Sequence, residues 1–171
     1  SILGTSRTNP FKHEDGSQKI FENIRKQNIG AIIAIGGDDT QTVAQKLHAM
    51  GLPCVGVPKT IDNDLTGTDY TLGFNTAVTI ATEALDRIHT TAEAHSRVMI
   101  VEVMGRYTGW IALESGIAGG ADVILIPEQP FDIDEVCDYI KRRLMQGRNF
   151  SVIVVAEGAK PKGGTEIVYS D

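Results

Sequence analysis

The sequence predicts an α/β protein that is doubly wound, with mostly parallel sheets and flanking helices. Apolar runs of strand length alternate along the chain with amphipathic segments of helix length, and this alternation implies right-handed crossovers between parallel strands. Several of the apolar runs are uninterrupted and bounded by glycine or proline, which is typical of strands buried on both faces.

The first part of the chain contains two expected pairs of a helix and a strand. Apolar residues at helical spacing predict a helix over 17–27, and the aliphatic run 31–35 predicts a strand buried on both faces. Helical spacing recurs across 43–50, and the short run 53–58 predicts the next strand. The glycine- and threonine-rich stretch 66–73 then predicts a hinge between two sub-domains.

The second part continues the alternation with a longer series. The apolar stripe across 78–88 predicts a helix, 98–103 a strand, 110–117 a helix and 123–126 a strand. These elements complete a pattern of strands joined by helical crossovers, which a parallel sheet requires.

The last helix and strand close the series. The spacing over 133–144 predicts a helix that turns Val136, Ile140 and Leu144 inward, and 152–155 predicts the final strand.

Composition excludes several classes of protein. The 171 residues include 16 Lys+Arg against 22 Asp+Glu, a formal net charge of −6, and the basic residues are scattered, so a nucleic-acid partner is not expected. No apolar run approaches the roughly 20 residues that span a bilayer, so no membrane partner is expected either. The two cysteines, Cys54 and Cys137, lie far apart, which favours a reducing, cytoplasmic location.

The residues directly after each predicted strand are the candidates for chemistry, because open α/β sheets bind ligands beyond the carboxyl ends of their strands. After the run 31–35 comes Gly36-Gly37-Asp38-Asp39-Thr40. Glycines and a helix N-terminus suit phosphate, and the carboxylates fit if one of them holds Mg²⁺. The alternative is that Asp38 or Asp39 simply caps the helix.

A second cluster follows the run 53–58. Residues 58–64 read Pro-Lys-Thr-Ile-Asp-Asn-Asp, so a cation, a hydroxyl and two acids stand at one strand end. Asx-turns would explain Asp62 and Asp64 without any function. A calcium loop is excluded, because its twelfth position falls on Gly73 where a bidentate Glu is required.

Arginine and glutamate residues lie next to the ends of the later predicted strands. Arg106 comes after 98–103 and Arg97 just before it, and both suit an anionic substrate, although a lone loop arginine is more often solvated. Glu128 and Glu157 follow two further strands and fit either sugar hydroxyls or helix caps. The residues therefore indicate a magnesium-dependent enzyme or binder of phosphorylated small molecules.

Several motifs in order strongly resemble the 6-phosphofructokinase family, over essentially the whole chain. They are residues 36–40 and 58–64, the segment 68–74 (Thr-Asp-Tyr-Thr-x-Gly-Phe), His95-x-Arg97, residues 101–106 (Val-Glu-Val-Met-Gly-Arg) and Ala118-Gly119-Gly120.

The resemblance implies roles for named residues, beginning with Asp62 as the base that deprotonates the sugar 1-hydroxyl. The other implied catalytic residues are Lys59, Arg7 and Arg106. For fructose 6-phosphate the implied residues are Thr60, Ile61, Asp62, Met104, Gly105, Arg106, Glu157 and, from a neighbouring subunit, Arg97. For the phosphoryl donor they are Gly37, Asp38, Asp39, Thr40 and Arg7, with Asp38 as the Mg²⁺ ligand.

The resemblance also implies which donor is used. ATP-using relatives typically carry glycine after the magnesium aspartate, whereas this chain has Asp39, whose carboxylate would fill the space for an α-phosphate and repel it. Lys59 matches the pyrophosphate-dependent type as well, but some ATP-using relatives share it. We therefore expect the pyrophosphate-dependent type, with an ATP-dependent enzyme and a non-catalytic sugar-phosphate-binding paralogue as alternatives.

The resemblance further implies how the chain is organised. Residues 1–73 correspond to part of the donor-binding lobe and 74–171 to part of the fructose 6-phosphate-binding lobe. The chain resembles the central portion of a protein about twice as long, so we expect the isolated piece to be inactive. An arginine supplied by a neighbour implies a homodimer or homotetramer.

Overall fold

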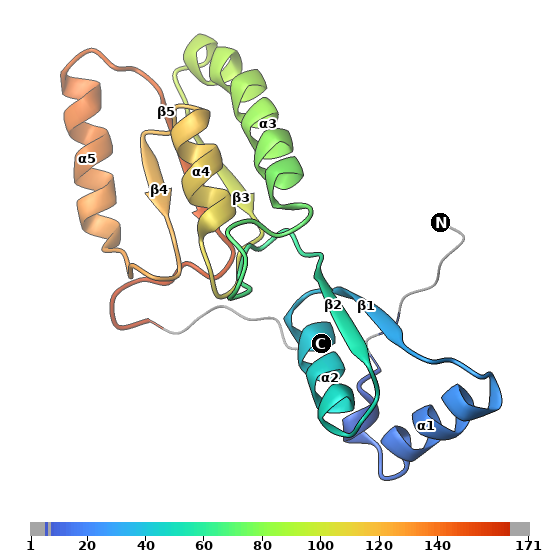
Figure 1. The fold of residues 1–171 in the computed structure, drawn as a ribbon. Helices are drawn as coiled ribbons and strands as arrows, with labels where there is room; N and C mark the ends of the chain where they lie inside the picture. Colours follow the sequence, from blue (N-terminus) through green and yellow to red (C-terminus); the bar gives the residue numbers. More distant parts are fainter. Residues whose placement is uncertain (1–5, 7, 165–171) are drawn as a thin grey trace. The chain divides into compact units, whose positions relative to one another are not determined.

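The computed structural model describes residue 6 and residues 8–164. They form an α/β structure that divides into two compact units, Ser1–Lys59 and Thr60–Asp171 (Figure 1). The resemblance implied lobes that meet after residue 73, and the two compact units of this chain meet after Lys59. The segment 60–73 belongs with the second unit, where the Asp62 carbonyl accepts from the Thr108 hydroxyl and the Thr71 carbonyl accepts from the Phe74 N–H.

The first unit is a parallel strand pair with helices. Ile32 of the first strand pairs with Cys54 of the second, and Gly36 pairs with Pro58, so both carboxyl ends lie at the same edge. Its elements are η1 (Pro10–Lys12), α1 (Gly16–Lys26), β1 (Ile32–Gly36), α2 (Asp38–Ala49) and β2 (Cys54–Pro58).

Apolar residues from α1, α2 and the β-strands form the core of the first unit. Ile24, Leu47 and Leu52 are buried together, and Ile32 and Cys54 pack against them. This core accounts for one face of the strand pair, since alternate residues of a strand point to opposite faces.

The other face of the strand pair corrects the expectation of burial on both sides. Ile33 is 68% exposed, Ile35 61% and Val55 62%. The run 31–35 forms a strand as predicted, but within the described residues the helices α1 and α2 account for one face only. We call Ile33, Ile35 and Val55 the open face.

The second unit contains a three-stranded parallel sheet in the order β3-β5-β4. Its elements are α3 (Phe74–Ala94), β3 (Val98–Val103), α4 (Trp110–Ala118), β4 (Val123–Leu125), α5 (Ile133–Met145) and β5 (Ser151–Ala156). The sequence order of strands and helices agrees with the predicted crossovers. Since β5 lies between β3 and β4, the last strand in the sequence is the central strand of the sheet.

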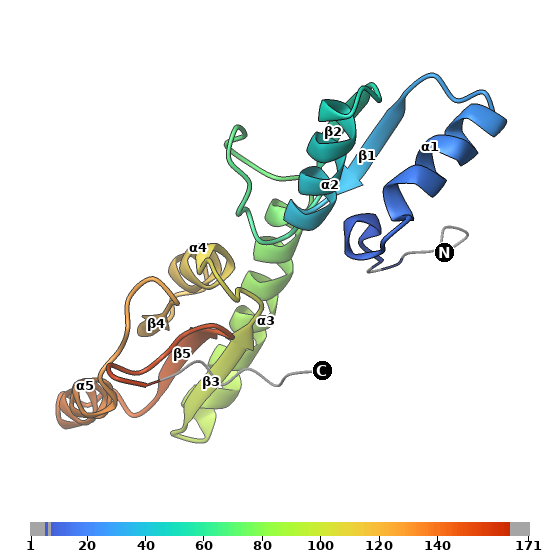
Figure 2. The same cartoon turned by 90° about the horizontal axis from the view of Figure 1, so that it is seen from below.

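The core of the second unit lies between the sheet and the pair α3 and α4 (Figure 2). Leu85 of α3, Ala112 of α4 and the β5 residues Val152 and Val154 are fully buried. The longest helix, α3, has 21 residues. No helix among the described residues combines the length and the apolar character needed to cross a membrane.

Helix α5 lies on the opposite side of the sheet from α3 and α4 (Figure 2). Arg143 of α5 contacts the Asp122 carboxylate at 2.7 Å and donates to the Ser151 hydroxyl at 3.1 Å. Leu144 was expected to face inward but is 61% exposed. Arg143, next to it in the helix, makes the contact with the sheet instead.

Candidate active site

Two acidic residues begin helix α2 at the carboxyl end of β1. Gly37 occupies the N-cap, and Asp38 and Asp39 are the first two residues of the helix, so neither is the cap. Both side chains are exposed, as is Thr40. The unpaired N–H groups and partial positive charge of a helix N-terminus stabilise the two carboxylates and also suit a phosphate.

Lys59 lies beside this helix N-terminus. Its backbone N–H donates to the Gly36 carbonyl at 3.1 Å, which fixes the end of β2 against the end of β1. The Gln41 side-chain amide donates to the carbonyls of Gly36 at 2.9 Å and Val57 at 2.8 Å. Gln41 therefore joins the two strand ends, a role that the sequence analysis missed.

The acidic residues of α2 suit a magnesium ion in the mode that Mg²⁺ prefers. Among the described residues no three His, Cys, Asp or Glu side chains gather as a ready-made metal site. Mg²⁺ usually takes one or two carboxylates and completes its shell with water and substrate phosphate. The exposed carboxylates of Asp38 and Asp39 fit that donor set.

The loop after Thr60 belongs to the second unit and is held by several side chains. The Thr60 hydroxyl donates to Asp62 Oδ2 and accepts from the Asp62 N–H, both at 3.3 Å. Asn63, with a φ of 52°, accepts from the Thr71 N–H at 2.9 Å. The buried Thr71 hydroxyl donates to the Thr60 carbonyl at 2.8 Å. These bonds hold the segment 60–73 together, and a hydrogen bond from the Thr108 hydroxyl to the Asp62 carbonyl joins it to the rest of the second unit.

The environment of Asp62 favours its protonated form. Burial raises the pKa of Asp62 above the ordinary aspartate value, and the charges of Asp64 and Glu157 raise it further, while the Thr60 hydrogen bond opposes them. Asp64 Oδ1 is buried and has no hydrogen-bond partner among the described residues. A raised pKa makes the ionised Asp62 carboxylate a stronger base than an ordinary aspartate, which suits a proton acceptor.

The turn Met104–Arg106 lies at the carboxyl end of β3, next to the end of β5. Gly105 has a φ of 142°, a conformation that favours glycine, and its carbonyl accepts from the Gly158 N–H at 3.0 Å. Glu157 Oε1 accepts from the Gly105 N–H at 3.4 Å. The turn and Glu157, which the resemblance assigns to one substrate site, are therefore adjacent in the structure.

Glu128 caps helix α4. Its two carboxylate oxygens accept from the Gly109 N–H at 2.9 and 3.2 Å, and Gly109 is the N-cap of α4. Of the two roles that the sequence left open for Glu128, the capping role is the one seen here.

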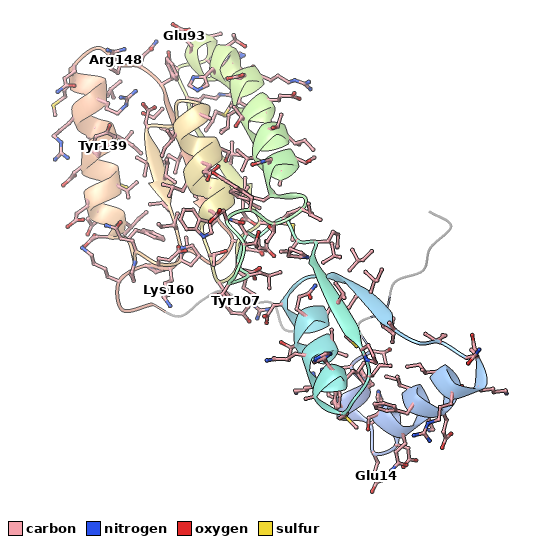
Figure 3. The ribbon with its side chains drawn as sticks, in the orientation of Figure 1. Glu14, Glu93, Tyr107, Tyr139, Arg148 and Lys160 are labelled. Atoms are coloured by element: carbon pink, nitrogen blue, oxygen red, sulfur yellow. The ribbon has the colours of Figure 1, made fainter. Side chains whose placement is uncertain are left out.

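The two arginines of the second unit differ in position. Arg106 follows β3, is exposed and stacks over the Tyr107 ring at 5.4 Å. Arg97 directly precedes β3, and its carbonyl accepts from the Ser151 N–H at the start of β5. Six residues of β3 separate it from the turn by about 20 Å. Figure 3 likewise shows Glu93, near Arg97 in sequence, at the opposite end of this unit from Tyr107.

The predicted site residues thus form two groups, one in each unit. Arg7 lies outside the described residues. The first unit brings together Gly37, Asp38, Asp39, Thr40 and Lys59. The second brings together Thr60, Ile61, Asp62, Met104, Gly105, Arg106 and Glu157, without Arg97 of the same copy.

Comparisons with known proteins point to a single family. The family model described as Phosphofructokinase matches residues 1–170. A Streptomyces coelicolor pyrophosphate--fructose 6-phosphate 1-phosphotransferase is 57% identical over 100% of this chain and 50% of its own length. A Chloroflexus aurantiacus ATP-dependent 6-phosphofructokinase is 54% identical over 99% of this chain and 48% of its own length.

A solved structure, Pichia pastoris phosphofructokinase in the T-state, superposes with a TM-score of 0.88 at 35% identity, over 98% of this chain and 20% of that one. The chain spans about half the length of the curated relatives it matches. The match over nearly every residue establishes that the chain belongs to the phosphofructokinase family.

Proposed function

We propose that the protein containing this chain transfers a phosphoryl group from pyrophosphate to the 1-hydroxyl of fructose 6-phosphate, giving fructose 1,6-bisphosphate in the cytoplasm. The observation that carries the proposal is the group formed by Asp62, the turn Met104–Arg106 and Glu157, in which a carboxylate of raised pKa lies near a cradle for a sugar phosphate. Family membership supports phosphoryl transfer to fructose 6-phosphate, whichever donor is used.

In this proposal each residue acts on one part of the transfer. Asp62 takes the proton from the 1-hydroxyl as that oxygen attacks the terminal phosphorus, and the bond to the bridging oxygen breaks so that orthophosphate leaves. Lys59, Arg7 and Arg106 offset the negative charge of the transferring group. Asp38 would hold Mg²⁺, which would supply positive charge to offset the negative charge of the phosphates.

Asp39 supports pyrophosphate as the donor. It is the second residue of α2, beside the N-terminus that would face the donor phosphates. A nucleotide has to place its α-phosphate and nucleoside where pyrophosphate ends, so a carboxylate there acts against ATP more than against pyrophosphate. The relatives include proteins named for each donor, so the donor has to be measured.

The donor is tested on the complete natural protein by comparing kcat/KM for pyrophosphate and for ATP, each with fructose 6-phosphate. We expect turnover with pyrophosphate and little with ATP. Asp39→Gly should raise kcat/KM for ATP, and Asp38→Gly, which removes the neighbouring carboxylate, should lower the rate with either donor. Efficient use of ATP by the unchanged protein, or an Asp39→Gly variant with unchanged ATP binding and turnover, would contradict the steric argument.

The binding-only alternative is tested at Asp62. Asp62→Asn keeps the shape of the side chain but removes the base, so kcat should fall by about 10²–10⁴-fold while the affinity for fructose 6-phosphate is retained. A paralogue that only binds the sugar phosphate would show no turnover before or after the change.

The proposal also includes a homodimer or homotetramer, in which Arg97 of one copy completes the sugar-phosphate site of another.

A further inference from the structure

Thr108 links the loop of Asp62 to the substrate-binding turn. The Thr108 hydroxyl donates to the backbone carbonyl of Asp62 at 3.0 Å, across 46 residues of sequence. Both residues are half-buried and both belong to the second unit. Among the described residues, this is the hydrogen bond that connects the loop 60–64 with the segment 104–109.

The segment that carries Thr108 is held tightly from three directions. A methyl group on Gly105 would lie 2.6 Å from the Thr108 carbonyl, so the turn folds back closely on Thr108. Gly109, the next residue, donates to both oxygens of Glu128. On the other side of the turn, Gly158 donates to Gly105 at 3.0 Å. Thr108 therefore presents its hydroxyl from a well-fixed backbone.

The loop of Asp62 is anchored mainly on either side of Asp62 itself. Thr71 holds the Thr60 carbonyl and Asn63 holds the Thr71 N–H. The Thr108 hydroxyl orients the backbone carbonyl of Asp62 itself. Without that bond, the Asp62 carbonyl in this half-buried loop would lose its protein partner, which removes one of the restraints on the loop.

We propose that Thr108 is a positioning residue that fixes the Asp62 peptide against the turn Met104–Arg106, so that the carboxylate meets the hydroxyl of the substrate bound there. This inference rests on the proposed function. Thr108 touches neither substrate nor reacting atoms in this role. It acts through Asp62, and proton transfer depends on the distance and direction of the carboxylate in the transition state.

The test compares three variants of the complete natural protein. Thr108→Val removes the hydroxyl at nearly constant shape, and Thr108→Ser retains it. Thr82→Val is the matched control, because the Thr82 hydroxyl also donates to a backbone carbonyl, that of Val78 at 2.9 Å, within helix α3. Steady-state kcat and KM for fructose 6-phosphate are measured together with hydrogen exchange of the peptide covering 60–64.

For Thr108→Val we expect kcat to fall about 10–100-fold with KM changed by less than about twofold, because misplacement of the base affects the transition state more than substrate binding. The loop 60–64 should exchange faster. Thr108→Ser should restore most of kcat, and Thr82→Val should match the unchanged protein in both measurements. Equal kcat for Thr108→Val and Thr82→Val would overturn the inference, as would a loss confined to KM.

Failure of the proposed function gives a different pattern. If the unchanged protein has no turnover with pyrophosphate or ATP, the proposed reaction is wrong. The positioning role of Thr108 is then judged only from the hydrogen-exchange rate of the peptide covering 60–64. Equal exchange rates in Thr108→Val and Thr82→Val would overturn that role. If Thr108→Val does not fold, Thr108→Ala replaces it under the same criteria. If neither folds, Thr108 serves the fold in general and the inference fails.

Discussion

A hydrogen bond from Thr60 stabilises the negative charge of Asp62, whereas its other surroundings destabilise that charge. Burial acts most strongly and raises its pKa, followed by the charge of Asp64. A base has to be ionised to accept a proton, so activity should fall as the pH drops through the pKa of Asp62. Because that pKa is raised, the acid limb of the rate profile should lie at higher pH than ordinary aspartate would give.

Replacing Asp64 by asparagine should move that limb. Asp64→Asn removes one of the charges that raise the pKa of Asp62, so Asp62 stays ionised to lower pH and the acid limb of kcat shifts downward. The measurement is kcat against pH between about 4 and 8, a window that extends upward from the ordinary aspartate pKa of about 3.9. Asp69→Asn, an exposed change in the same loop, is the control; an equal shift in both would contradict the charge effect.

At the residue scale, short motifs predicted part of the site. Asp38 and Asp62 could be predicted because each follows an aliphatic run closely, and strand ends are where α/β proteins bind ligands. Thr108 and Gln41 could not. Their partners are 46 and 16 residues away, and a threonine or glutamine of this kind has no sequence pattern that distinguishes it from a solvated one.

At the scale of elements, the turn Met104–Arg106 depends on how closely the segment that follows β5 approaches it. A methyl group on Gly158 would meet the carbonyl oxygens of Arg106 and Gly105, the latter at 2.9 Å. Both partners are backbone atoms, so the turn would have to move.

We therefore expect Gly158→Ala to raise KM for fructose 6-phosphate by about tenfold and to destabilise the protein by about 1–3 kcal/mol. The measurements are steady-state kinetics and the free energy of unfolding in urea. Gly30→Ala is the control, since no atom lies within 4 Å of the added methyl group. Wild-type KM for Gly158→Ala would show that the turn tolerates displacement.

Glu128 stabilises the start of α4 through charge as well as through hydrogen bonds. Glu128→Gln keeps one acceptor for the Gly109 N–H but removes the negative charge at a helix N-terminus, which should cost about 0.3–1 kcal/mol. The difference should shrink in high salt because the charge effect is screened. Urea unfolding at low and high ionic strength measures it, and a cost independent of salt would contradict the electrostatic part.

Element order and some of the bounds followed from periodicity, whereas the full lengths of α2 (Asp38–Ala49) and α3 (Phe74–Ala94), predicted over 43–50 and 78–88, and the burial pattern did not. The predicted strand 98–103 coincides with β3, and the predicted helix 133–144 with α5 to within one residue. Ile33, Ile35 and Leu144 are exposed where the pattern indicated burial. The spacing of apolar residues shows which of them share a face of a helix or strand. It does not show which other element packs against that face, because that depends on the tertiary structure.

At the scale of the whole molecule, Arg97 bears on assembly. It lies at the opposite end of the second unit from the turn of its own copy, so its proposed role in substrate binding requires another copy. In a dimer, each site would then combine Asp62 of one protomer with Arg97 of its partner.

Mixing two inactive variants tests this arrangement. Arg97→Ala and Asp62→Asn should each have very low activity alone. When the two are unfolded and refolded together in equal amounts, random pairing gives mixed dimers with one intact site, and activity should recover to about a quarter of the unchanged protein. No recovery, with mixed dimers demonstrated by mass spectrometry, would place both residues in the same copy's site.

The open face of the first unit has a consequence for biosynthesis. Ile33, Ile35 and Val55 stand together on one side of a strand pair whose other side is already packed. While the chain leaves the ribosome, this sheet can fold from residues close in sequence yet still present an adhesive apolar surface. The nascent chain should therefore be a good client for chaperones that recognise aliphatic side chains until that surface is covered.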